Sequence, residues 1–340
     1  MPGIEADHES VGGKIVLRYI TDLAHARSDR DSVVTLGKFD GFHRGHQQLF
    51  GRLYRMKQEH GWVTAAFTFD AELMYYKFGK QIRCILEKDE RRRLFERLDV
   101  DMMIECPFTD EVRTMEAERF IKDILVDQLK ARCIVVGRDF RFGHNRRGSY
   151  EMLADMASEY GYEVQMIDEV YDGDVRISSS KIREALREGR VEDANRMLGY
   201  YFTVEGTILN GEHLGRTIDM PTINLVPSPI KLLPPYGVYV SIVEIEDKTY
   251  AGVTNIGRKP TVGEFAVGVE THLLHTQGNF YGKFAKVHLL HFARLEQKFP
   301  SIEVLKEQVH RDKENAENWL KVHPKITEPE ELDFGSFVEK

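Results

Sequence analysis

The pattern of apolar and polar residues divides the chain into two parts with different periods. Between residues 32 and 198, short apolar runs alternate with longer stretches in which apolar residues such as Leu49, Leu53 and Met56 recur every three or four positions. Such runs are typical of buried strands, and the longer stretches of amphipathic helices. Alternating strands and helices predict right-handed crossovers and a covered parallel sheet. We expect strands at 32–39, 62–69, 101–108, 132–137 and 162–168, and helices at about 45–60, 88–98, 116–129 and 149–160.

After residue 199 the apolar runs follow one another without helical stretches between them. Turn-forming residues such as Asn and Gly separate these runs, which predicts a small antiparallel barrel. Near the end, apolar residues return to helical spacing, and we expect a last helix over 301–322 with Ser301 as its N-cap. The strands are expected at 201–209, 237–245, 249–256, 268–275 and 286–295.

These two patterns predict a fold of the α/β plus β class. The chain has 340 residues, longer than one typical domain, and its 42% hydrophobic content is enough for two cores. We expect a Rossmann-like parallel sheet over 15–187 and an antiparallel barrel with a C-terminal helix over 188–325. The stretch 187–200 is expected to form a short helical boundary.

Charge and cysteine content narrow the class of protein. Lys and Arg number 47 against 55 Asp and Glu, a net charge of −8, which argues against a surface built for duplex nucleic acid or an anionic membrane. Cys84, Cys106 and Cys133 are far apart and are expected to be buried thiols in a reducing compartment. The first residues do not show the basic segment followed by an apolar segment that is typical of a signal peptide. No run approaches the roughly 18 apolar residues of a membrane span. We therefore expect a cytoplasmic protein with neither nucleic-acid nor membrane partners.

The first strand-to-helix turn, in the sequence TLGKFDGFHRGHQQLF over 35–50, is the first candidate site. We expect its strand to run to Phe39 and two imidazoles to face one side of the first helical turn, beside backbone N–H groups that attract phosphate. The small residues in this turn would let a nucleotide approach. A solvated helix start and a zinc pair are the alternatives, and zinc would need two further ligands. The corner and helix start carry, in order, Asp40, Gly41, His43, Gly45 and His46.

Three further segments follow strands or begin a helix. The loop VVGRDFRFGHNRRGSY contains four arginines, Arg138, Arg141, Arg146 and Arg147, which indicates either an anion site or an exposed basic loop. The stretch RISSSKIREAL places serines and two cations at a predicted helix start. Such a pattern is typical of a phosphate-binding site or of a helix N-cap without a ligand. Aromatic residues in FTFDAELMYYK either flank a flat ligand or pack in the core.

Together, G-K-F-D-G-F-H-R-G-H, G-R-D-F-R-F-G and I-S-S-S-K-I-R resemble the nucleotidyltransferase half of bifunctional bacterial riboflavin kinase/FMN adenylyltransferases. The resemblance implies that His43 and His46 contact ATP phosphates and stabilise charge at the α-phosphorus. It also implies that the outgoing pyrophosphate binds Ser179, Ser180 and Arg183. Further nucleotide contacts are expected from Gly37, Phe39, Asp40, Gly41 and Gly45, and a flavin contact from Asp139. Two departures are visible, since Asp70, Ala71, Glu72 and Leu73 replace a proline-histidine-proline turn and Lys38 replaces an asparagine.

The second candidate site combines two segments of the predicted barrel. In GRTIDMPTINL, Thr222 and Asn224 are two residues apart, so on a strand they share a face and offer oxygen atoms to Mg²⁺. Alternatively, they satisfy backbone groups of a local turn. In GVETHLLH, Glu270 and His272 share a face by the same period, and the carboxylate is either a base for an attacking hydroxyl or a surface charge.

With N-I-G-R-K-P-T and R-L-E-Q-K-F, these segments resemble a riboflavin kinase domain. The resemblance implies a six-stranded barrel in which Thr222 and Asn224 hold Mg-nucleotide and Glu270 takes the proton from the ribityl 5′-hydroxyl. Gly215 and Arg216 are expected to bind nucleotide, and Arg294 the flavin. Ile218, Asp219 and Met220 depart from the family's usual leucine-glycine-phenylalanine. A P-loop kinase is excluded because no G-x-x-x-x-G-K-[ST] occurs.

The combined prediction is an enzyme that phosphorylates riboflavin to FMN with ATP and then adenylylates FMN with a second ATP, giving FAD and pyrophosphate. One alternative keeps the kinase and treats the adenylyltransferase half as weakened by the altered turn at 70–73. A second alternative is a metal-binding barrel that uses histidines. Its weakness is that a spacing of three on a strand sends His272 and His275 to opposite faces. The histidines in question are His272, His275, His288 and His291.

Overall fold

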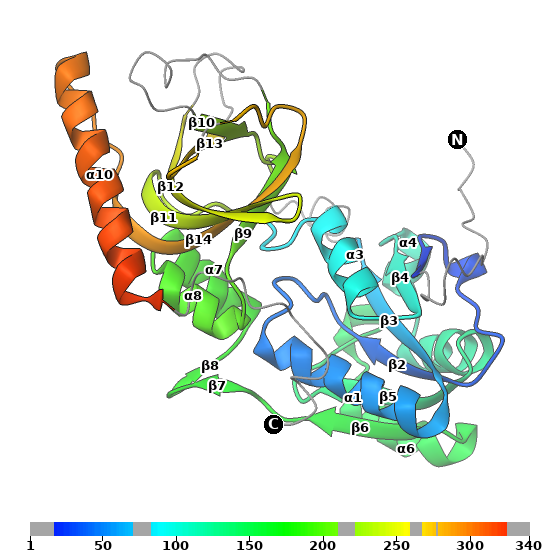
Figure 1. Ribbon diagram of the computed structural model, residues 1–340. Helices are drawn as coiled ribbons and strands as arrows, with labels where there is room; N and C mark the ends of the chain where they lie inside the picture. The colour runs from blue at the N-terminus through cyan, green and yellow to red at the C-terminus, as the bar shows by residue number, and fades with distance from the viewer. Residues whose placement is uncertain (1–16, 71–82, 210–221, 259–266, 277, 325–340) are drawn as a thin grey trace. The chain divides into compact units, whose positions relative to one another are not determined.

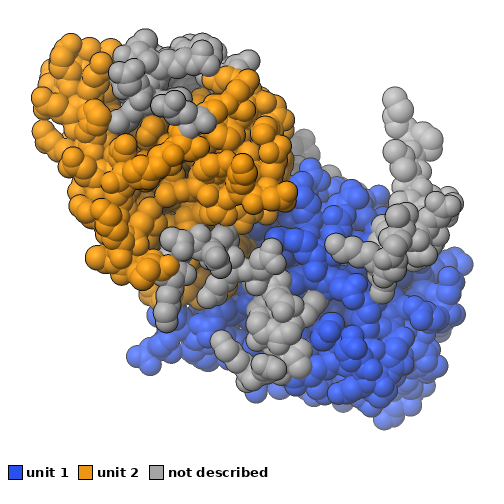
Figure 2. All heavy atoms as spheres, viewed as in Figure 1, with its two compact units in different colours: residues 1–82, 86–177, 332–340 blue, residues 83–85, 178–331 orange. Residues whose placement is uncertain are grey.

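The computed structural model describes residues 17–70, 83–209, 222–258, 267–276 and 278–324. The chain forms two compact units, shown in different colours in Figure 2. Unit 1 comprises 1–82, 86–177 and 332–340, and unit 2 comprises 83–85 and 178–331. The expected helical boundary at 187–200 contains the helix α8 (Val191–Leu198). A second helix, α7 (Ser179–Arg187), precedes it, and both belong to unit 2.

Unit 1 is built on a six-stranded parallel sheet, as the alternating pattern predicted (Figure 1). The strand order is β1-β4-β3-β2-β5-β6. Successive strands extend from β2 toward β3 and β4 on one side, and the chain then crosses to β5 and β6 on the other. The carboxyl ends of β2 and β5 thus meet at the point where the order reverses, which is where open α/β sheets bind ligands. The strands are β1 (Arg18–Ile20), β2 (Ser32–Leu36), β3 (Val63–Phe69), β4 (Met102–Cys106), β5 (Ala131–Gly137) and β6 (Glu163–Ile167).

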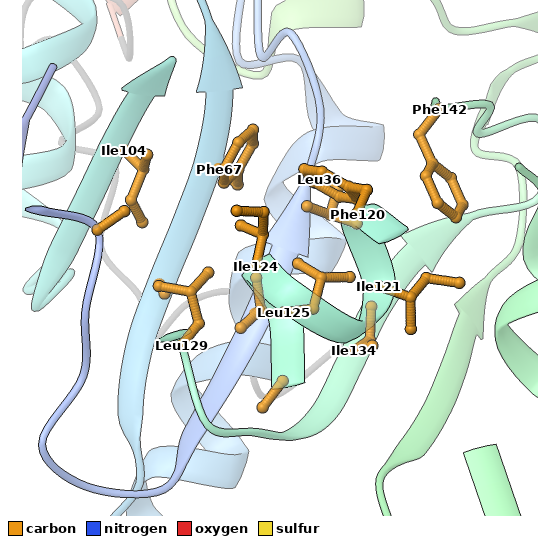
Figure 3. Packing of buried hydrophobic residues seen from close by; sticks show 14 of the residues in the cluster. Leu36, Phe67, Ile104, Phe120, Ile121, Ile124, Leu125, Leu129, Ile134 and Phe142 are labelled. Atoms are coloured by element: carbon orange, nitrogen blue, oxygen red, sulfur yellow. The ribbon is translucent and has the colours of Figure 1, made fainter. Parts of the chain in front are cut away.

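Helices cover both faces of this sheet. On one face Leu36, Phe67 and Ile134 pack against apolar residues of the segment 117–129, including Phe120 and Ile124 (Figure 3). On the other, a second buried cluster lies beneath α1 (Arg44–His60) and α3 (Lys88–Arg97). The helix expected at 116–129 is divided into α5 (Ala117–Arg119) and a π-helix, η2 (Phe120–Gln128). The other elements are η1 (Leu23–His25), α4 (Asp110–Thr114), η3 (His144–Arg146), α6 (Tyr150–Tyr160) and a hairpin, β7 (Tyr171–Asp172) with β8 (Val175–Arg176).

Unit 2 is a six-stranded antiparallel barrel, as expected. Its strand order is β10-β13-β12-β11-β14-β9, and the two end strands approach each other where Leu209 N–H donates to the Asn224 carbonyl at 2.9 Å. Inside, the hydroxyls of Ser241, Thr254 and Thr271 form a buried hydrogen-bonded row. The strands are β9 (Thr203–Thr207), β10 (Thr222–Leu225), β11 (Gly237–Ile245), β12 (Lys248–Arg258), β13 (Val267–Leu273) and β14 (Phe284–Leu295).

The last helix, α10 (Ile302–Val322), begins where the sequence predicted. Ser301 is its N-cap, and the Ser301 side chain accepts a hydrogen bond from Val304 N–H. The prediction of buried thiols is also confirmed, because Cys84, Cys106 and Cys133 are buried and none of the three is in a disulfide. Within the described ranges, no helix combines the length and the apolar character needed to cross a membrane.

A three-residue excursion interrupts unit 1. Residues 83–85 belong to unit 2, where Cys84 N–H donates to the Ile230 carbonyl at 2.7 Å and the Cys84 carbonyl accepts from Leu232 N–H at 2.8 Å. Between these two bonds lies Lys231, which is 2% exposed and donates from Nζ to the Ile85 carbonyl at 3.0 Å. The chain therefore contributes to unit 2 long before the boundary at residue 178.

Candidate active sites

The turn between β2 and α1 has an unusual backbone. The strand ends at Leu36, three residues before its expected end, because the chain turns sharply after Gly37 N–H pairs with the Phe67 carbonyl. Phe39 and Phe42 have φ values of +48° and +33°, a region that side chains rarely adopt. Such conformations cost free energy and persist only where the surroundings hold them.

Buried aromatic rings hold this backbone in place. The rings of Phe39 and Phe42 are fully or almost fully buried and make edge contacts with Phe50 and Phe95. A Cβ on Gly37 would lie 2.7 Å from the Phe39 ring. Gly37 is therefore needed to make room for the Phe39 ring of the protein itself. The sequence did not predict this role.

The two histidines come together as predicted. His43 is the N-cap residue of α1 and His46 lies in its first turn, and their rings stack with centroids 3.7 Å apart and planes inclined by 18°. A Cβ on Gly45 would lie 3.2 Å from the His43 ring, so the glycine leaves room for this stack. The His46 ring also meets the Phe39 ring edge-on at 5.4 Å.

His46 is held in its neutral form. Burial and the neighbouring His43 lower the pKa of His46 well below its ordinary value of 6.5. Its Nδ1 atom is buried and finds no hydrogen-bond partner among the described residues. A neutral imidazole at a helix N-terminus offers one compact N–H donor in a region that already attracts negative charge.

Buried polar side chains fix the remaining groups of the turn. Asp40, predicted to contact nucleotide, is 6% exposed and accepts a hydrogen bond from Leu86 N–H at 3.0 Å. Gln47 Nε2 donates to the Phe42 carbonyl at 2.9 Å. The Lys38 carbonyl accepts from Thr68 Oγ1 and Arg91 Nη1, each at 3.3 Å.

Arg91 is a residue that the sequence analysis missed. It is buried and forms an ion pair with the buried carboxylate of Glu105 on β4. Arg91 stands in a run of charged residues that looks like a solvated helix face. The signal that was available is the acid itself, since Glu105 interrupts the otherwise apolar strand M-M-I-E-C.

Two of the four arginines in the basic loop after β5 are paired with acids. Arg138 lies 2.7 Å from Asp168. Asp139, predicted to contact the flavin, is paired at 2.6 Å with Arg176, which also contacts Glu169. Of the other arginines in the expected anion site, Arg147 lies 3.6 Å from Glu116 and Arg141 donates to the Phe140 carbonyl. The loop is thus a mixed-charge surface rather than a uniformly positive one.

The predicted serine cluster forms the start of α7, in unit 2. Ser178 is the N-cap, with its side chain accepting from Lys181 N–H, and Ser179 and Ser180 occupy the first turn. Arg183 Nε donates to the Arg83 carbonyl at 3.4 Å. These residues lie in a different unit from the histidine pair.

The second site lies on three adjacent strands of the barrel. Glu270 on β13 is paired in register with Asn224 on β10 and with Asn255 on β12. Thr222 Oγ1 donates to Glu270 Oε1 at 2.6 Å. Since Val269 and Thr271 are buried inside the barrel, Glu270 points to its outer face. The expected grouping of Thr222 and Asn224 with the Glu270 carboxylate is therefore present.

Arg294, predicted to contact the flavin, is engaged with an acid of the last helix. Arg294 Nε and Nη2 contact the buried Asp312 of α10 at 2.9 and 2.6 Å, so its guanidinium links β14 to the helix. Gly215 and Arg216 lie outside the described residues, as do 71–73 and 218–220.

The histidines of the metal-binding alternative are engaged separately. β13 ends at Leu273, so the argument from alternating strand faces does not apply to His275, which lies 3.1 Å from Glu317. His288 contacts Thr203 and Glu244, and His291 pairs with Glu192. In the part of the chain that the structure describes, no group of three or more His, Cys, Asp or Glu residues is placed to hold a metal ion.

Comparison with known proteins matches both halves. The FAD synthetase family model matches residues 25–181, and the riboflavin kinase family model matches residues 198–320. A bifunctional riboflavin kinase/FMN adenylyltransferase of Escherichia coli K12 is 33% identical over 307 residues, covering 90% of this chain and 97% of that protein. The protein of the same description from Listeria monocytogenes is 31% identical, covering 85% and 92%.

A solved structure also matches over most of the chain. It is a crystal structure from Streptococcus pneumoniae described as a macrolide-efflux protein, with 30% identity and a TM-score of 0.80. The match covers 90% of this chain and all of that one. The fold is therefore similar over that span to an experimentally determined structure.

Proposed function

Because the chain belongs to the family of bifunctional riboflavin kinase/FMN adenylyltransferases, we propose that it makes FAD from riboflavin in two ATP-dependent steps. The riboflavin kinase region converts riboflavin and ATP to FMN and ADP. The FAD synthetase region then converts FMN and a second ATP to FAD and pyrophosphate. The observation that carries the proposal is that both family regions are present in one chain, which aligns with nearly the full length of its bifunctional relatives.

The kinase step is proposed to occur on the outer face of the barrel at Glu270. In our proposal, the Glu270 carboxylate accepts the proton of the riboflavin 5′-hydroxyl as that oxygen attacks the γ-phosphorus of ATP, and ADP leaves. The hydrogen bond from Thr222 holds one carboxylate oxygen in a fixed position. Positioning of this kind supplies much of the rate in phosphoryl transfer.

Thr222 and Asn224 are proposed to hold Mg²⁺ with the nucleotide. The support is chemical, since hydroxyl, amide and carboxylate oxygens are the donors that this hard cation prefers, and the three side chains are grouped on neighbouring strands. The ion would neutralise charge on the transferred phosphate. The Thr222 hydroxyl can donate a hydrogen bond to Glu270 while its oxygen lone pairs remain available to bind the ion.

The adenylyl transfer is proposed to use the stacked histidines. FMN phosphate oxygen attacks the α-phosphorus of ATP, and pyrophosphate leaves. His43 and His46 are proposed to donate hydrogen bonds to phosphate oxygens at the start of α1. Fixed donors aimed at developing charge need no reorganisation during the reaction. Neutral His46 makes this contact without a prior change of protonation.

The remaining site assignments stay predictions. Phe39 has a fully buried ring, so a nucleotide contact there would involve its backbone. Gly37, Asp40, Gly41 and Gly45 belong to the same turn. Pyrophosphate contacts are assigned to Ser179, Ser180 and Arg183, further nucleotide contacts to Gly215 and Arg216, and flavin contacts to Asp139 and Arg294. We place the enzyme in the cytoplasm, where ATP is supplied and free thiols persist.

One assay tests the proposal. Purified protein is incubated with riboflavin, ATP and Mg²⁺, and in a parallel reaction with FMN in place of riboflavin, and the flavins are separated by chromatography. We expect FMN and then FAD in the first reaction, and FAD in the second. FMN without FAD in both would support the alternative of a weakened adenylyltransferase half. Unchanged riboflavin and unchanged FMN would refute both steps.

A further inference from the structure

Arg91 connects a buried acid to the backbone of the histidine turn. It lies on α3, is 3% exposed, and forms an ion pair with Glu105, which is 2% exposed. From the same guanidinium, Nη1 donates to the Lys38 carbonyl at 3.3 Å. Arg91 therefore joins the carboxyl end of β4 to the turn that follows β2.

Glu105 is itself fixed from two more directions. Tyr19 on β1 donates its hydroxyl to one carboxylate oxygen, and Lys88 Nζ lies 2.9 Å from the same oxygen. Burial and the hydrogen bond to Glu105 raise the pKa of Tyr19 to about 12, so its hydroxyl stays a donor at neutral pH. The acid that orients Arg91 is thus a rigid support.

The contact with Lys38 falls at a sensitive position. The next residue is Phe39, whose φ of +48° must be maintained by its surroundings. The Phe39 ring touches the His46 ring edge-on at 5.4 Å. A change in the Lys38 peptide would therefore move Phe39, and with it the imidazole of His46.

Stability alone is a weak reason for this arrangement. Buried ion pairs can often be replaced by apolar residues of similar volume without loss of stability, because desolvation offsets the attraction. Arg91 carries an additional cost, since its buried Nε finds no hydrogen-bond partner among the described residues. What an apolar residue cannot supply is the second of the two described donors to the Lys38 carbonyl, the other being Thr68 Oγ1 at 3.3 Å.

We propose that Arg91 is a positioning residue for adenylyl transfer, and that the pair Arg91–Glu105 holds the histidine turn in its active geometry through the Lys38 carbonyl. This inference rests on the proposed adenylyltransferase function. In this proposal Arg91 contacts neither the substrate nor the reacting atoms. It acts through Lys38 and Phe39 on His46.

The test measures kcat and KM for FAD formation from FMN and ATP in Arg91→Met, Arg91→Lys and Glu105→Gln. Displacement of a catalytic group by about 1 Å can cost about 100-fold in rate, and we expect kcat to fall about 10- to 100-fold in Arg91→Met with a smaller change in KM. Arg91→Lys should recover part of the rate, because the ammonium keeps the positive charge and a hydrogen-bond donor. Recovery should be incomplete, because an ammonium lacks the fork geometry of the guanidinium. The matched control is Arg97→Met, an exposed arginine on the same helix, which should retain the wild-type kcat.

A double-mutant cycle separates positioning from general destabilisation. If Arg91 acts through His46, Arg91→Met should cost little further activity in a protein that already carries His46→Ala. A purely structural role predicts that the two losses multiply. Should Arg91→Met fail to fold, the cycle is run with Glu105→Gln, which preserves the shape of the side chain.

The outcomes distinguish this inference from the proposed function. If the wild type forms no FAD from FMN, the adenylyltransferase proposal fails and this inference with it. If the wild type forms FAD and Arg91→Met keeps the wild-type kcat, only the role of Arg91 is refuted. Multiplying losses in the cycle would also refute it.

Discussion

The imidazole rings of His43 and His46 lie in a parallel stack, 3.7 Å between centroids, across a glycine that has no side chain to separate them. Stacking in a buried site disfavours a positive charge on His46, because burial removes water and His43 opposes protonation. His46 therefore presents a neutral donor at the N-terminus of α1.

Replacing His46 by alanine should stop the second step alone. Loss of one fixed donor to a developing charge typically costs about 100- to 1000-fold in rate. We expect FMN to accumulate from riboflavin while FAD formation falls by about that factor. His60→Ala, an exposed histidine on the same helix, is the control. An equal fall in FMN formation would contradict separate sites.

Gly45→Ala should lower adenylyl transfer without weakening the helix. Alanine is favoured over glycine within a helix by about 1 kcal/mol, which would stabilise α1. The added Cβ would meet the His43 ring at 3.2 Å and displace it. We expect a lower kcat for FAD formation with an unchanged or higher melting temperature. Gly206→Ala, where the Cβ would meet no neighbour within 4 Å, controls for the substitution. A wild-type kcat in Gly45→Ala would show that the stack tolerates the methyl group.

The free energy of unfolding should depend on His46 in mild acid. His46 has a folded-state pKa below 6.5, whereas the unfolded side chain titrates near 6.5. Below that pH the unfolded chain binds a proton that the folded chain does not, so stability falls as pH falls, by at most about 1.4 kcal/mol per pH unit. Urea unfolding at about pH 7.5 and about pH 5.5 measures this loss. It should be smaller in His46→Gln than in the wild type or His60→Gln, and an equal loss in all three would count against the prediction.

Glu270→Gln should stop the first step alone. Removal of a general base costs about 100- to 10,000-fold, and glutamine keeps the shape of the side chain and an acceptor for Thr222. FAD formation from supplied FMN should persist at the wild-type rate. Glu314→Gln, an exposed acid on α10, is the control. Undiminished FMN formation in Glu270→Gln would require a different base.

Thr222→Val should raise the Mg²⁺ concentration needed for FMN formation. Valine preserves volume but removes both the hydroxyl oxygen and the donor to Glu270. The measurement is a Mg²⁺ titration of the kinase rate, with Thr222→Ser expected to behave like the wild type. A half-saturating Mg²⁺ concentration unchanged by the valine would remove Thr222 from the proposed metal site.

The sequence predicted the longer strands and the grouping of the main site residues because their patterns are local or periodic. The central strands β2, β3 and β5 are apolar runs long enough to recognise, and Thr222 with Asn224 shares a face by the period of a strand. The short strands β1, β7 and β8 were not predicted. β1 has three residues and β7 and β8 have two each, which is too few to show a period.

Other features depend on contacts far apart in the chain. The ion pair of Arg91 with Glu105 and the ion pair of Arg294 with Asp312 both join separate elements, so neither pairing can be recognised from the residues next to the arginine in sequence. The early end of β2 depends on Phe39, which has a buried ring and a left-handed backbone conformation. A pattern of apolar residues does not predict such a conformation.

The excursion of residues 83–85 bears on any attempt to express the two activities as independent proteins. A truncation that begins at residue 178 would keep every strand of the barrel but discard Arg83, Cys84 and Ile85. The severed barrel would lose the carbonyl to which the Lys231 ammonium donates, and the two backbone bonds of Cys84 as well. Supplying the missing peptide, or grafting it onto the new N-terminus, would be the way to recover a stable kinase fragment.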